Sequence, residues 1–234
     1  MIRMRNVRAV FVKQVWDTLK NLQVLVLFIV YPVVTFVMIQ AMGAQVGDRY
    51  FFLSMFAVMH CVFTPMVSTA AAVSEEKEKN TLRILILSGV KPVEYLLSIA
   101  LFIWIATQVT GFAFIAMGNC SFRQGAVLFV LFTAGCLPST LLGLCIGLQA
   151  RNMAGANAVA VPVGMVFAFL PMLAFFNETI EKAARFIYSY QIGEAIREVG
   201  AGEEALAKGS VIAMVYLVLF SGLFWWIFRR RRWE

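Results

Sequence analysis

The sequence has little charge and little cysteine for its length. Only 14% of its 234 residues are Asp, Glu, Lys or Arg, against about 25% in an average soluble domain, so polar side chains are too few to cover a globule in water. Four cysteines do not make the disulfide framework of a small secreted scaffold. A hydrophobic fraction of 61% excludes intrinsic disorder. The class that remains is a helical protein that crosses a membrane several times.

Six stretches of the chain lack Asp, Glu, Lys and Arg altogether. A spanning helix needs about 20 mostly apolar residues, and each stretch is at least that long. They are residues 21–47, 50–74, 95–122, 124–150, 152–177 and 209–228. The sequence therefore predicts an all-α membrane protein, with six transmembrane helices in a single domain over residues 1–234. A cleaved signal peptide is the alternative for the first stretch, although the apolar core of a signal peptide has only ~7–15 residues.

The net charge of +7 indicates the orientation of these spans. Six spans put both termini on one side, and the segments on that side carry 14 of the 20 Lys and Arg residues. Basic residues accumulate in cytoplasmic loops, so both termini are predicted to be cytoplasmic. The net charge is then +8 inside and −1 outside, and the basic excess gives no reason to expect nucleic-acid binding.

Two segments outside the spans have helical periodicity. In residues 1–20, apolar residues recur at steps of three and four, which predicts an amphipathic helix along the cytoplasmic surface. A basic flank that only sets the orientation is the alternative. Residues 178–208 predict one or two short amphipathic helices on the outer side, with Asn177 as the N-cap of the first.

The segment after the second span combines charge with an apolar run. Residues 75–79 are all charged, and the apolar residues that follow are too few to cross a bilayer and too hydrophobic for a solvated loop. We expect a short cytoplasmic helix within residues 75–90 that docks into another protein through Leu82, Leu85 and Ile86, with the charges as a rim. The alternative is an interfacial helix packed on its own bundle.

Two motifs in this region point to a family. The first reads EEKEKNTL from Glu75, and the second reads KPVEYLL from Lys91. Together with the N-terminal helix and the six spans, they resemble the permease subunits of type 2 ABC transporters, where a Glu-x-Glu-x-Gly/Asn-Thr-Leu stretch follows the second span. This chain has Asn80 at the glycine position and Ser98 where a lysine is usual, and neither difference falls on the apolar face.

The resemblance implies a membrane-spanning subunit of an ATP-driven exporter in the bacterial cytoplasmic membrane. A second copy or a paralogue would complete the pathway, residues 1–20 would be the elbow helix, and residues 75–90 the coupling helix. The residues implied to contact a separate ATPase subunit are Glu75, Glu76, Glu78, Thr81, Leu82, Leu85 and Ile86. That subunit would bind ATP and Mg²⁺, and no cofactor is expected in this chain. The sequence agrees, since it has no Gly-x-x-x-x-Gly-Lys-Ser/Thr loop. An ATP-independent membrane scaffold or small channel with a non-ATPase partner is the alternative.

Other chemistry has few candidates in the sequence. Within the six stretches, His60 is the residue suited to a proton relay, with Thr64, Ser68 and Gln108 as polar company. The alternative for His60 and Gln108 is an interhelical hydrogen bond or a place in the lining of the pathway. The cysteines lack the spacing of a metal or redox site, and no hydrolase motif is present. An ion-coupled carrier and an ordinary enzyme are therefore disfavoured.

Gly143 and Gly147 form a Gly-x-x-x-Gly pair within the fourth stretch. This spacing allows two helices to approach closely. The sequence leaves open whether the pair packs against another helix of the same chain or against a second copy.

Overall fold

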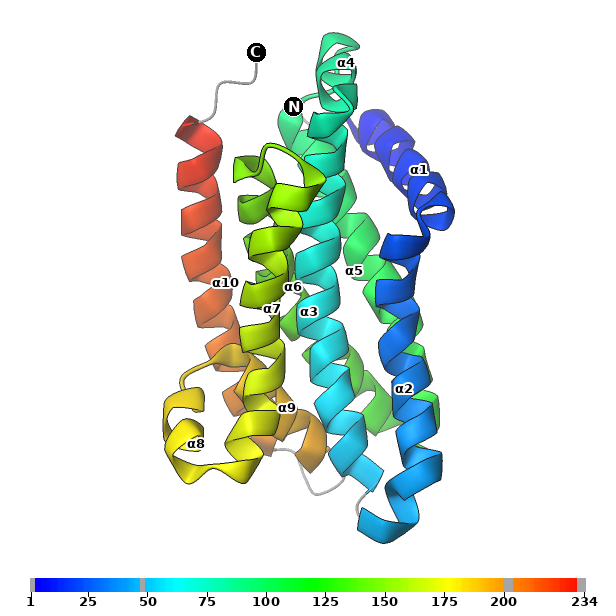
Figure 1. Cartoon of the computed structure of the whole chain (residues 1–234), viewed down its shortest axis with the longest axis vertical. Helices are drawn as coiled ribbons and strands as arrows, with labels where there is room; N and C mark the ends of the chain where they lie inside the picture. Colours follow the sequence, from blue (N-terminus) through cyan, green and yellow to red (C-terminus); the bar gives the residue numbers. More distant parts are fainter. Residues whose placement is uncertain (1–2, 47–48, 200–203, 231–234) are drawn as a thin grey trace.

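The computed structural model describes residues 3–46, 49–199 and 204–230 (Figure 1). These ranges are almost entirely helical and contain no strand. Their helices are α1 (Met4–Lys20), α2 (Leu22–Val46), α3 (Arg49–Glu78), α4 (Thr81–Leu87), α5 (Pro92–Met117), α6 (Phe122–Gln149), α7 (Met153–Phe176), α8 (Glu178–Ala184), α9 (Tyr188–Glu198) and α10 (Glu204–Arg230).

Six of these helices, α2, α3, α5, α6, α7 and α10, are long and apolar enough to cross a membrane. The predicted all-α membrane fold with six long apolar helices is therefore confirmed. Helices α1 and α4, the turn between α6 and α7, and the last residues of α10 lie at one end of the bundle, which we call the α4 end (Figure 1). Helices α8 and α9 lie at the other end.

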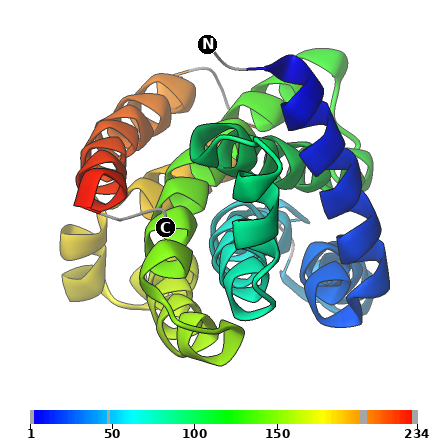
Figure 2. The same cartoon turned by 90° about the horizontal axis from the view of Figure 1, so that it is seen from above.

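Helix α3 is the centre of the bundle. Its apolar window is 83% buried, whereas that of α10 is 11% buried. It packs against α2, α5, α6, α7 and α9, and the view along the bundle shows the other long helices around it (Figure 2). The peripheral helices α2, α7 and α10 carry most of the exposed large apolar side chains, as expected where lipid is the solvent.

Local capping explains where several helices begin. Ser121 accepts a hydrogen bond from the Gln124 amide, and the Gln124 side chain accepts one from the Ser121 amide, so α6 starts with a capping box. The predicted N-cap at Asn177 is confirmed, because its side chain accepts from the Thr179 and Ile180 amides at 2.9 and 3.2 Å.

The two short amphipathic segments pack against the long helices. Helix α1 lies across the start of α5, where the Glu94 carboxylate accepts from the Arg3 amide at 2.6 Å and the Asn6 side chain at 2.7 Å. Helix α9 inserts among α3, α6, α7 and α10, and its first residue, Tyr188, shares a 2.8 Å hydrogen bond with Ser139 of α6. Both segments thus belong to the folded bundle.

Candidate docking site at the α4 end

Two residues with positive φ set the bounds of α4. Helix α3 continues through Glu78, four residues beyond the predicted second span. Asn80 then has φ of 57° and Gly89 has φ of 91°. Asparagine and glycine are the residues that adopt this left-handed backbone most readily, which explains Asn80 at the motif position usually held by glycine. The helix between these two residues is Thr81–Leu87, seven residues long, and so occupies only part of the predicted segment 75–90.

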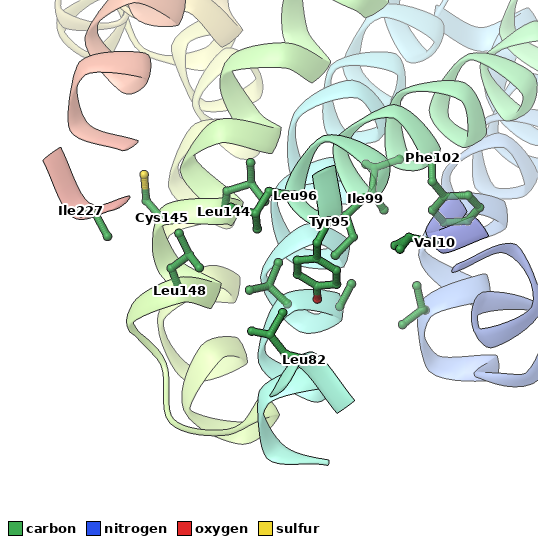
Figure 3. Close-up of a cluster of buried hydrophobic side chains, with 14 of the residues drawn as sticks. Val10, Leu82, Tyr95, Leu96, Ile99, Phe102, Leu144, Cys145, Leu148 and Ile227 are labelled. Carbon is green, nitrogen blue, oxygen red and sulfur yellow. The ribbon is translucent and has the colours of Figure 1, made fainter. Parts of the chain in front are cut away.

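The apolar residues of α4 divide into two faces. Leu82 is 7% exposed and belongs to a core cluster shared with α1, α5, α6 and α10 (Figure 3), and Leu85 and Ile86 pack against the same cluster. Ile84 and Leu87, by contrast, are 64% and 78% exposed. The face predicted to dock into a partner therefore packs on the bundle of its own chain, and the exposed face is the one that carries Arg83, Ile84 and Leu87.

The two glutamates that open the charge cluster bind within the chain. Glu76 is buried, and its carboxylate accepts from the Lys13 ammonium of α1 and from the Thr81 hydroxyl at the start of α4. Glu75 pairs with Lys79 at 2.5 Å and accepts from the Asn21 side chain, at the corner between α1 and α2, at 3.3 Å. These carboxylates thus hold α1 and α4 to the end of α3.

Lys13 is the basic centre of this network. Partial burial lowers its pKa, but hydrogen bonds and charge attraction from Asp17 and Glu76 outweigh burial, so the pKa is raised above its usual 10.5. A cavity of about 660 Å³ opens beside it between α1, α3 and α4, lined by both acidic and basic side chains. The cavity is therefore bordered by the charged residues of this network and belongs to the same site.

The next two residues of α3 reach two other helices. Lys77 donates to the carbonyls of Gly147, Leu148 and Ala150 at the end of α6. Glu78 accepts from the Met153 amide, at the start of α7, at 2.9 Å. The role of Lys77 is not predictable from the sequence, and the assignment of Glu78 to a partner is not what the structure shows, because backbone groups of distant helices leave no pattern in side-chain types.

Comparison with known families decides what kind of protein carries this arrangement. Residues 34–230 match the model of the ABC-2 family transporter proteins. The chain belongs to the ABC-2 transporter family. No curated protein matches it significantly. As a member of this family it is a membrane permease subunit, and the match includes the second span, α4 and everything that packs around them except α1 and the first part of α2.

Three of the polar residues named inside the spans, His60, Thr64 and Gln108, are hydrogen-bonded in this ABC-2 permease, but not to one another. The buried hydroxyl of the fourth, Ser68, has no hydrogen-bond partner among the described residues. The His60 ring nitrogen Nε2 lies 3.1 Å from the Thr107 carbonyl and 3.0 Å from the Thr110 hydroxyl. Gln108 instead donates to Thr133 at 2.8 Å, and Thr64 donates to the Leu27 carbonyl at 2.9 Å. His60 and Gln108 thus bridge different helix pairs, and both are buried.

The glycine pair of the permease packs within the chain. A Cβ atom added at Gly147 would lie 2.9 Å from the Ala70 carbonyl oxygen, and one at Gly143 would overlap the Met66 carbonyl oxygen. Both contacts are to α3, so the pair allows α6 to approach the central helix. Across the described residues, no three His, Cys, Asp or Glu side chains are grouped as metal ligands would be.

Proposed function

We propose that this chain is the membrane-spanning subunit of an ATP-driven exporter and couples to a separate ABC ATPase at the α4 end. ATP binding would draw two ATPase subunits together, and α4 would transmit that motion to the bundle. The observation that carries the proposal is the exposed apolar face of α4, at a helix that the family match includes.

The distribution of charge supports a cytoplasmic location of the α4 end. Helices α1 and α4, the α6–α7 turn and the last residues of α10 all lie there (Figure 1), and the segments that contain them carry 14 of the 20 basic residues. Cytoplasmic loops collect such residues. At the end of α10, Arg229 and Arg230 lie over the rings of Trp225 and Trp226, each 4.1 Å from the ring centre, a combination suited to the lipid headgroup region.

The apolar face of α4 is suited to an ATPase surface. Ile84 and Leu87 are one helical turn apart, which is the spacing of anchors on a helix that enters an apolar groove. Their exposure at the α4 end, where α4 projects beyond the neighbouring helices (Figure 1), leaves them free for a partner. Arg83 beside them provides a rim charge.

We propose two membrane subunits for each transporter, either two copies of this chain or this chain with a paralogue. The exposed apolar surfaces of the peripheral helices provide area for such a contact and for lipid. ATP and Mg²⁺ would be bound by the ATPase, since this chain has no phosphate-binding loop.

Purification from the native host tests the proposal. The tagged chain is extracted in mild detergent, and co-purifying proteins are identified by mass spectrometry. We expect an ABC ATPase with the wild-type chain, and its loss with Ile84→Asp or Leu87→Asp, because a charge on the apolar face is desolvated on docking. The matched control is Val93→Asp, a change of the same kind at a half-exposed residue at the same end but outside α4.

Two results would contradict the proposal. The absence of any ATPase with the wild-type chain would favour the scaffold or channel alternative. Equal ATPase recovery with Leu87→Asp and Val93→Asp would mean that α4 is not the docking element. Leu85→Asp does not discriminate in this way, because Leu85 packs on the core and its substitution would destabilise the chain itself.

A further inference from the structure

The turn between α6 and α7 is held by two adjacent charged residues of α3. Helix α6 ends at Gln149 and α7 begins at Met153. The last carbonyls of a helix and its first amides have no partner within that helix. Lys77 supplies donors to three carbonyls at the end of α6, and Glu78 supplies an acceptor to the first amide of α7.

The signs of these two charges match the two helix dipoles. The C-terminal end of a helix carries partial negative charge, and the N-terminal end carries partial positive charge. Lys77 lies at the negative end of α6, and Glu78 lies at the positive end of α7. Neighbouring residues of opposite charge thus each contact the helix end that attracts them, and reversing the order would place both at ends that repel them.

We propose that Lys77 and Glu78 form a charge clamp that fixes the α6–α7 turn to the end of α3, so that a movement imposed on α4 also reaches α6 and α7. Helix α4 starts only three residues after Glu78, and Glu76 bonds Thr81 at its first position. The turn and α4 are therefore attached to the same last turn of α3. This role in transmission rests on the proposed coupling to an ATPase, whereas the clamp itself is a property of the isolated chain.

Hydrogen–deuterium exchange of the purified chain tests the clamp. Lys77→Met keeps the side-chain length but removes the charge and the donors, and we expect amide exchange over residues 147–153 to accelerate about tenfold. Lys77→Arg should restore slow exchange. Lys79→Met is the matched control, because it removes a lysine two residues away whose ammonium binds Glu75 and not the α6–α7 turn. Equal exchange in Lys77→Met and Lys79→Met would overturn the proposal.

Reversing the two charges separates a dipole clamp from a simple need for charge. The double variant Lys77→Glu, Glu78→Lys keeps the composition and net charge, and we expect exchange over residues 147–153 at least as fast as in Lys77→Met. Wild-type exchange in the double variant would refute the clamp. If Lys77→Met does not fold, Glu78→Gln tests the α7 half of the clamp. This variant keeps an acceptor oxygen for the Met153 amide but removes the negative charge at the start of α7. Faster exchange at Met153 and the first turn of α7 is then expected, and unchanged exchange there would contradict the proposal.

Paired spin labels test whether the turn and the end of α3 move together. Labels on Lys79→Cys and Arg151→Cys, both exposed positions, are placed in a Cys120→Ser background because the other three cysteines are buried. We expect a narrow distance distribution in the otherwise wild-type chain and a broad one with Lys77→Met. Equal widths would overturn the proposal. Failure to recover an ATPase would leave these results on the isolated chain unchanged, so the two proposals fail separately.

Discussion

Gly143→Ala tests the packing of α6 on the central helix. The added methyl group would overlap the Met66 carbonyl oxygen and lie 3.0 Å from Thr69 Cβ, so α6 and α3 must move apart. Both neighbours lie on or beside the α3 backbone, which cannot rotate away as a flexible side chain does. Overpacking of this kind costs ~1–3 kcal/mol, and the backbone overlap places Gly143 near the upper value.

The matched control for this substitution is Gly222→Ala in α10. A Cβ added at Gly222 meets nothing within 4 Å, and alanine is the better helix former by up to ~1 kcal/mol. The same intrinsic gain applies at Gly143, so we expect a net loss of about 2 kcal/mol there against a small gain at Gly222.

Reversible unfolding in mixed detergent micelles, followed by circular dichroism, measures both free energies, and size-exclusion chromatography reports the oligomeric state. Equal stability of the two variants would refute the packing argument. A change of oligomeric state in Gly143→Ala without loss of stability would instead assign the glycine pair to a contact between copies.

Two further predictions concern charged groups at the α4 end. Glu94→Gln should loosen α1 from α5, because the carboxylate accepts from three donors, Arg3, Asn6 and Lys91. We expect faster limited trypsin digestion in residues 1–20. The control is Glu181→Gln, which breaks an exposed pair in α8 and should change nothing near α1. ATPase recovery with the wild-type chain should differ little between low-salt and high-salt buffers. The reason is that the glutamates of the cluster are bonded within the chain and the proposed docking face of α4 is apolar. A steep loss of ATPase at high salt would contradict docking through this apolar face.

The spans were predictable because they depend on one local property. A charge-free stretch of 20 or more residues has no soluble alternative in this composition, and a membrane span imposes its own length. The N-cap at Asn177 was predictable for a similar reason, since the capping side chain and the amides that it binds lie within three residues of one another.

The exposed face of α4 was not predictable from local pattern. A seven-residue helix with five apolar residues has apolar groups all around, so the sequence alone does not choose between Leu82 with Leu85 and Ile84 with Leu87. The choice is made by the core cluster to which Leu82 belongs, whose other members, among them Tyr95 and Leu144, come from other helices of the chain (Figure 3). The partners of His60 and Lys77 were missed for a related reason, because they include main-chain carbonyls.

The dense charge cluster at the end of α3 follows from the central position of that helix. Consecutive residues of an α-helix point about 100° apart, so the four residues Glu75–Glu78 together face nearly the whole circumference. Glu75 reaches the α1–α2 corner, Glu76 reaches α1 and α4, Lys77 reaches α6, and Glu78 reaches α7. The four side chains thus contact α1, the α1–α2 corner, α4, α6 and α7 around the central helix. The cluster that resembles a rim for a partner protein therefore joins the chain's own helices at this end, and the apolar tip of α4 stays exposed.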